Sequence, residues 1–195
     1  MGVSLSKGQR ISLEKSGGGQ LTQVAMGLGW DVAKPQGGFM KRLAAPKSVD
    51  LDASCLMFDP GKNLVDQVWF RQLDSRDGSV HHTGDNLTGA GEGDDEVIEV
   101  DLSRVPATVQ TLVFTVNSFT GQSFTNIENA FCRIVDRTNG SEVARYDLSS
   151  QGNHTAQVMA RVYRDNAGGW KMHAIGENCS GRTFQDLLPY VVPHI

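Results

Sequence analysis

The chain has 195 residues, of which 39% are hydrophobic and 21% charged, and its formal net charge is −4 at pH 7. This composition excludes a disordered chain, and the length suits one domain with a sizeable core. The acidic balance gives no reason to expect nucleic-acid binding. No stretch reaches the roughly 18 apolar residues of a membrane span, and the start lacks the apolar core of a signal peptide, so we expect a cytoplasmic protein without membrane insertion.

Residues 32–48 form the first distinctive segment. They contain Lys34, Lys41, Arg42 and Lys47 but no acid, together with Gly37-Gly38 and two prolines. A basic stretch without strand alternation is typical of an exposed loop. We therefore predict a mobile basic insertion at about 32–48 within a single domain that covers residues 1–195.

Residues 49–57 alternate between apolar and polar side chains. Leu51, Ala53 and Cys55 fall on one face of an extended segment, and Asp50 and Asp52 fall on the other. This pattern predicts a β-strand with one polar, acidic face. Cys55 is one of three widely spaced cysteines, an arrangement that favours reduced, buried thiols over disulfides or a zinc site.

An acidic segment follows at residues 77–103, which contain eight acids and no Lys or Arg. Its centre interleaves glycines with the carboxylates of Asp85, Glu92, Asp94, Asp95 and Glu96. Glycines let a backbone turn sharply and direct carbonyls inward, and calcium takes six to eight oxygen ligands of these kinds. Close carboxylates repel by about 4 kcal/mol at an effective dielectric near 20, so their concentration favours a calcium site over a solvated acidic loop.

Known calcium motifs do not fit this segment. Residues 85–96 have the length of an EF-hand loop, but Leu87 and Gly89 occupy ligand positions and no helices flank it. Residues 90–98 resemble one nonapeptide of a β-roll, which needs stacked copies. The adjacent pair His81-His82 is interpreted as turn histidines, because neighbours in an extended segment point to opposite sides and cannot easily hold one ion.

The second half of the chain continues the strand pattern. Alternation at 98–102, 112–116, 156–162 and 170–174 predicts four strands, and the turn at 165–169 joins the last two as a hairpin. Residues 126–130 suggest one short helical turn. Residues 183–188 have a capping residue and helical apolar spacing, so we predict a short C-terminal helix that Pro189 stops. Many short strands with Gly-rich turns indicate an all-β fold, a sandwich or a barrel.

Four segments resemble the TerD family of tellurite-resistance and stress proteins in the right order. They are Val3-Ser4-Leu5-Ser6-Lys7-Gly8-Gln9, Met26-Gly27-Leu28-Gly29-Trp30-Asp31, Val49-Asp50-Leu51-Asp52-Ala53-Ser54, and Gly84-Asp85-Asn86-Leu87-Thr88-Gly89 with Gly93-Asp94-Asp95-Glu96. Within this family, the basic insertion after Asp31 is most similar to the TerZ branch.

The resemblance implies a β-sandwich that binds Ca²⁺ at neighbouring sites through Gly-rich acidic loops. It also implies a role in resistance to tellurite, phage or colicins or in general stress, with other proteins of that system as partners. The acidic motif residues of the family match Asp31, Asp50, Asp52, Asp85, Asn86, Asp94, Asp95 and Glu96.

Two functions remain open at this point. The first is a calcium-dependent binding or scaffold module that is not an enzyme, in which the ion orders loops that partners contact. The alternative is a divalent-metal-dependent phosphohydrolase that holds its ions with Asp50, Asp52, Asp94 and Asp95. The alternative lacks an evident general base, and no Lys or Arg lies within the cluster to contact phosphate. Calcium selectivity would favour the module, and dependence on magnesium or manganese would favour the enzyme.

Overall fold

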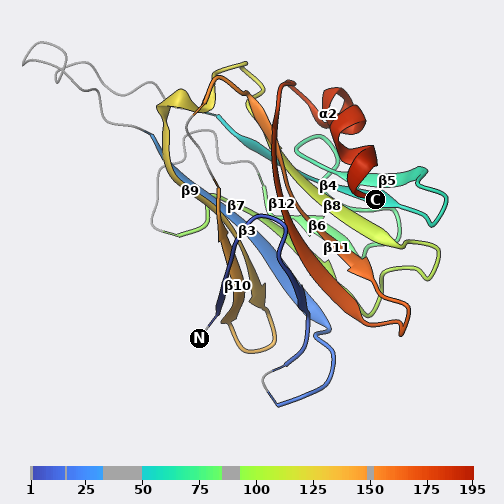
Figure 1. The fold of residues 1–195 in the computed structure, drawn as a ribbon. Coiled ribbons are helices and arrows are strands. Elements are labelled where there is room, and N and C mark those ends of the chain that lie inside the picture. The colour runs from blue at the N-terminus through green and yellow to red at the C-terminus, as the bar shows by residue number, and fades with distance from the viewer. Residues whose placement is uncertain (1, 16, 33–49, 85–92, 149–151) are drawn as a thin grey trace, which may run out of the picture.

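The computed structural model describes residues 2–15, 17–32, 50–84, 93–148 and 152–195 of the chain. They form two six-stranded β-sheets and one short α-helix (Figure 1). The first sheet has the order β1 (Val3–Leu5), β10 (Ser141–Asp147), β9 (Ile127–Asp136), β3 (Gln23–Val32), β7 (Glu96–Asp101) and β6 (Val80–His82). The second has the order β2 (Arg10–Ser12), β12 (Trp170–Cys179), β11 (Ala156–Arg164), β8 (Thr111–Asn117), β4 (Asp52–Phe58) and β5 (Leu64–Val68).

The two sheets pack face to face as a sandwich. Their inner faces share one apolar core that includes Trp30, Met57, Phe114, Ile134 and Met172. All neighbouring strands are antiparallel except β1 and β10, which pair in parallel. The predicted all-β sandwich is therefore confirmed, and so is the hairpin of β11 and β12.

Helix α2 (Phe184–Val191) covers part of the outer face of the second sheet (Figure 1). Its buried side chains Phe184, Leu187 and Val191 pack on a second apolar cluster that includes Leu56 and Val113. Strands β4 and β8 are consequently buried over their whole length. The polar face predicted for residues 49–57 thus lies under protein rather than in solvent, with Asp52 only 4% exposed.

Two local predictions were wrong. The helix does not stop at Pro189 but continues to Val191, followed by a 3-10 turn at Val192–His194. Proline removes one backbone donor there, and the burial of Leu187 and Val191 against the sheet offsets that loss. The short helical turn lies at Phe124–Asn126, and residues from Ile127 onward form strand β9 instead.

The described residues also bear on the predictions for the cysteines, for membrane insertion and for the basic insertion. The three cysteines are free and buried, and burial raises the pKa of Cys132 to about 12. None of the helices in the described ranges is long and apolar enough to cross a membrane. The predicted basic insertion at 32–48 lies outside the described residues, apart from Val32 at the end of β3.

The start of helix α2 gives a first prediction. The carboxylate of Asp186 accepts hydrogen bonds from the backbone N–H groups of Arg182 and Thr183, at 2.8 and 3.2 Å. Replacing an acceptor at a helix N-terminus costs about 1 kcal/mol. Asp186→Ala is therefore expected to lower the free energy of unfolding by about 1 kcal/mol in urea denaturation. Gln185→Ala, one residue earlier and exposed, is the control and should change it little.

A candidate metal centre at the end of β3

Residues 93–95 lie along the C-terminal half of β3. The backbone N–H of Asp95 donates to the carbonyl of Leu28 at 2.8 Å, and the Asp95 carboxylate accepts from the N–H of Trp30 at 2.9 Å. These bonds continue the ladder in which β7 pairs with β3 from Gln23 to Leu28. The acidic segment therefore reaches the sheet at the end where β3 meets the start of β9.

Two glycines of β3 make room for this segment. Met26, Leu28 and Trp30 point into the core, so Gly27 and Gly29 face outward from the first sheet. A Cβ on Gly27 would overlap the carboxylate of Asp94, and one on Gly29 would lie 2.5 Å from the Phe131 ring and 2.8 Å from the Gly93 carbonyl. The Gly27-Leu28-Gly29 pattern thus lets the acidic segment and Phe131 lie directly on the strand.

Gly27→Ala tests this close approach. The new methyl group would displace the Asp94 carboxylate from its position beside β3. Overpacking of this kind costs about 1–3 kcal/mol, which we expect to see as a loss of unfolding free energy in urea. Ala25→Ser, an outward position two residues earlier on the same strand, is the control. A Gly27→Ala protein as stable as the wild type would contradict the tight packing described here.

A cavity of about 300 Å³ opens beside this segment. Its lining residues come from β3, the acidic segment, β9 and β10, and are Trp30, Asp31, Gly93, Asp95, Asn129, Phe131 and Arg145. Asn129 adopts a left-handed backbone conformation with φ 53° and donates its side-chain amide to the Asp31 carboxylate at 2.8 Å. The cavity therefore gathers two carboxylates, one carboxamide and one guanidinium.

The two carboxylates of the cavity favour a cation, and Arg145 supplies one positive charge to the same lining. Partial burial raises the pKa of Asp95, and the neighbouring charges of Asp31 and Asp94 raise it further, although the hydrogen bond from Trp30 opposes them. A raised pKa means that the ionised carboxylate is destabilised where it stands. A bound cation would remove that destabilisation, because it attracts the same charges that repel one another.

Asp94 is held on the outer face of the first sheet. Its carboxylate accepts a hydrogen bond from Nε of Arg133 at 2.8 Å, and Nη1 of the same arginine lies 3.3 Å from Glu142. The hydrogen bond to Asp94 is the largest cause that raises the pKa of Arg133. Asp94 thus already forms an ion pair with Arg133, whereas the sequence motifs predicted it to be a metal ligand.

Glu96 points the other way, into the space between the sheets. Its carboxylate accepts from the backbone N–H of Ala53 at 2.5 Å and lies 3.5 Å from Nε2 of His82. Both side chains are fully buried. The N–H of Gly84 donates to Nδ1 of His82 at 3.1 Å, which places the proton of a neutral imidazole on Nε2, toward Glu96. Glu96 therefore links β7 of one sheet to β4 of the other.

The interpretation of His81-His82 as turn histidines was wrong, because both belong to strand β6. Their side chains do point to opposite sides, as expected for an extended segment. His82 is buried beside Glu96, whereas His81 is half-exposed and lies 2.7 Å from Asp74.

Asp52 lies on the helix-covered side of the second sheet. Its carboxylate is 3.4 Å from the amide nitrogen of Asn117, and Asn117 also donates to the carbonyl of Arg182 at 2.7 Å. Asp50 is half-buried just before β4. Since Asp94 lies on the outer face of the first sheet, Asp52 and Asp94 are on opposite sides of the sandwich. Asp85 and Asn86 lie outside the described residues.

The predicted cluster therefore divides into parts. Asp31 and Asp95 share a cavity, while Asp94, Glu96 and Asp52 each have other surroundings. Within the described ranges, no group of three or more His, Cys, Asp or Glu side chains could hold a metal ion. Sequence reasoning also missed Asn129, Arg133 and Arg145, although alternation along 127–136 would have placed the first two on one face.

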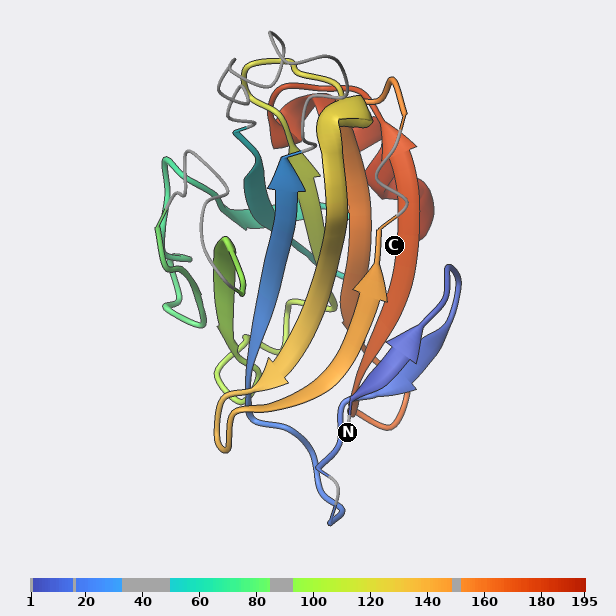
Figure 2. The same ribbon diagram turned by 90° about the vertical axis from the view of Figure 1, so that its left-hand side faces the viewer.

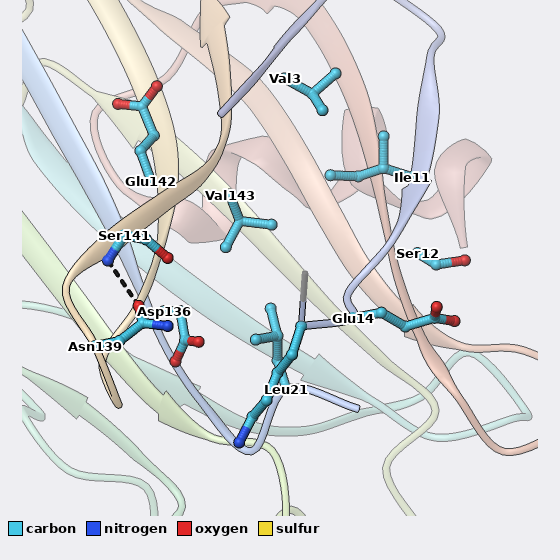
Figure 3. Close-up of a pocket in the computed structure, with 11 residues that line it drawn as sticks. Val3, Ile11, Ser12, Glu14, Leu21, Asp136, Asn139, Ser141, Glu142 and Val143 are labelled. Atoms are coloured by element: carbon cyan, nitrogen blue, oxygen red, sulfur yellow. Dashed lines mark hydrogen bonds between the residues drawn. The ribbon is translucent and has the colours of Figure 1, made fainter. Parts of the chain in front are cut away.

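A second cavity, of about 220 Å³, lies between β1 and β10 of the first sheet and β2 of the second (Figure 3). Val3, Ile11 and Val143 give it an apolar part. Its buried carboxylate, Asp136, accepts from the backbone N–H and the hydroxyl of Thr138 at 2.9 and 2.7 Å. Asp136 is therefore used in the turn that joins β9 to β10 and does not make this cavity a metal site.

Comparison with known proteins places the sequence among relatives. The family model described as the TerD domain matches residues 1–189. The chain belongs to the TerD family. It is 51% identical over 190 residues to the tellurium resistance protein TerZ of Serratia marcescens, which covers 97% of both chains. It is 41% identical over 197 residues to the stress response protein SCP2 of Bacillus subtilis (strain 168), which covers 96% of this chain and 98% of that protein.

The TerD fold also appears in a solved structure. A homologue of telluride resistance protein (TerD) from Streptomyces coelicolor A3(2) superimposes with a TM-score of 0.68, at 18% identity over 86% of this chain and 95% of that chain. The resemblance drawn from sequence motifs is thereby confirmed at the level of the family. Two of those motifs meet in the structure, because Gly27-Leu28-Gly29-Trp30-Asp31 carries the segment Gly93-Asp94-Asp95-Glu96.

Proposed function

We propose that this TerD-family chain is a calcium-dependent binding module of a tellurium-resistance or stress-response system. The observation that carries the proposal is the cavity that brings together the carboxylates of Asp31 and Asp95, where burial and the nearby charge of Asp31 raise the pKa of Asp95. The names of the relatives, a tellurium resistance protein and a stress response protein, support the biological setting.

The donor chemistry of the cavity fits calcium. Its candidate ligands are the carboxylates of Asp31 and Asp95, the side-chain oxygen of Asn129 and the carbonyl of Gly93, all of them hard oxygens. Two carboxylates are few for calcium, so we expect Asp85 and Asn86, in the segment that ends beside Gly93, to supply further ligands. When bound, the ion would neutralise these carboxylates and hold the two acidic motifs together.

A module of this kind would act through a partner rather than through catalysis. Calcium that joins β3 to the acidic segment would fix the loops at this end of the sandwich, where β3 ends beside the 3-10 turn at Phe124–Asn126 (Figure 2). We propose that other proteins of the same resistance or stress system recognise this end in the cytoplasm, in the calcium-bound form.

A divalent-metal-dependent phosphohydrolase is the second candidate. One specific observation favours it, because Arg145 lines the same cavity and supplies the cation that the sequence cluster lacked. Arg145 also pairs with Asp147 at 2.8 Å and stacks over Phe131, so it already has partners in the protein.

Titration calorimetry with calcium, magnesium and manganese separates the two candidates. The binding module requires calcium to bind more tightly than the other two ions, with no hydrolysis of p-nitrophenyl phosphate in any of them. Phosphate release that depends on magnesium or manganese would overturn the module in favour of the enzyme. Failure of all three ions to bind would overturn both.

A further inference from the structure

Three basic residues form a straight row across the outer face of the second sheet. Strand pairing places Arg10 of β2 directly opposite His173 of β12, and His173 directly opposite Arg161 of β11. All three side chains face outward, because their neighbours Ile11, Met172 and Val162 contact the inner core. The row spans about 10 Å, since adjacent strands lie about 4.8 Å apart. The row therefore places one imidazole between two guanidinium groups.

The described residues do not neutralise this row. None of its three members forms an ion pair there, and the nearby Lys171 and Glu177 are paired with Asp165 and His194. Nε of Arg161 and Nδ1 of His173 are shielded from solvent and lack hydrogen-bond partners within the described ranges. Arg161 stacks on Tyr163, and its Nη1 donates to the carbonyl of His194, which fixes the guanidinium at one end of the row.

From this geometry we infer that Arg10, His173 and Arg161 form a binding site for a small, doubly charged oxyanion. Arginine presents several donors in a planar fork that matches oxyanions, and charge-assisted hydrogen bonds to such groups are strong. The short row and its end at the C-terminal 3-10 turn suit a compact anion such as sulfate or phosphate better than an extended acidic chain. The site lies on the face opposite Asp94 and does not depend on calcium.

The pKa of His173 should report whether an anion is bound, because cationic side chains surround this imidazole. Burial, together with the positive charges of Arg10, Arg161 and His194, lowers the pKa of His173 to about 4. Tyr163, Lys171 and Glu177 complete the titratable groups on the faces packed around it. A bound dianion would oppose the repulsion by the cations and favour the imidazolium form, so the pKa of His173 should rise.

The test is an NMR pH titration of the His173 imidazole in the full chain, with a calcium chelator present throughout. His173→Gln identifies the resonance. We expect sulfate, which stays a dianion over the whole titration range of His173, to raise the pKa by one pH unit or more relative to chloride at equal ionic strength, which is a tenfold gain in proton affinity. Equal values in the two salts would overturn the site. Because calcium is absent, this outcome is independent of the proposed calcium function.

Matched variants distinguish a specific anion site from nonspecific attraction of anions to a positively charged surface. Arg10→Gln changes an exposed side chain and should weaken phosphate binding about tenfold. Arg76→Gln removes the same charge from an exposed side chain outside this row and should leave phosphate binding unchanged. Equal weakening by both variants would overturn the inference. Phosphate should bind at neutral pH, where it carries its second charge, and binding of sulfate without phosphate would contradict recognition by shared charge and shape.

Discussion

Calcium is expected to raise the melting temperature of this protein by about 5–11 °C at a free concentration of 100 times its dissociation constant. A ligand that binds only the folded state at one site then adds about 2.7 kcal/mol of stability. In a domain of this length, each kcal/mol corresponds to about 2–4 °C. The stabilisation arises because the ion neutralises Asp31 and Asp95, and without the ion both burial and the charge of Asp31 destabilise the ionised form of Asp95.

Thermal melts in calcium, magnesium and chelator at equal ionic strength measure this effect. Magnesium keeps more of its own waters and should stabilise less than calcium. The chelated protein should still unfold in one transition, because its apolar core extends between both sheets without any ion. Equal melting temperatures in all three solutions would falsify the calcium proposal.

Much of the sandwich was predictable from strand alternation. Strands β3 and β4 show why the rest was not. Strand β3 carries Gly27 and Gly29 on its outer face, so its alternation is between apolar residues and glycine rather than between apolar and polar residues. Its conformation is set by the segments that pack on those glycines. Strand β4 showed alternation, but helix α2 covers its second face, and no local pattern reveals such a tertiary cover.

The candidate site was predictable in its residue types but not in its grouping. Asp94, Asp95 and Glu96 are consecutive, but the chain bends at Asp95 before β7 begins at Glu96, so Asp94 lies on the outer face and Glu96 points inward. Sequence proximity therefore overstated how many carboxylates could meet at one point. Asn129 and Arg133 come from β9, which lies beside β3 only after folding, so their contacts depend on strand order rather than on any motif.

Asp95→Asn should weaken calcium binding about 100-fold. Loss of even an indirect, outer-shell partner typically weakens metal binding by 10–100-fold, so the loss of a carboxylate ligand should reach the upper end of that range. The metal-free protein should be as stable as the wild type or more stable at pH 7. The pKa of Asp95 is raised in the folded state, so this group favours folding at low pH and opposes it as the pH rises through that folded pKa. The substituted carboxamide carries no charge, and this pH dependence should disappear from urea denaturation between about pH 3 and 6.

Two further substitutions make the result specific to the cavity. Asp74→Asn removes an exposed carboxylate that contacts only His81 among the described pairs and should leave calcium binding unchanged. Asp52→Asn removes one on the opposite side of the sandwich, beside Asn117. If one ion binds at the cavity, calorimetry should show a far smaller loss for Asp52→Asn than for Asp95→Asn. Equal losses in these two variants at a stoichiometry of one would mean that Asp52 and Asp95 share an ion, and would contradict the separation of the acidic residues described here.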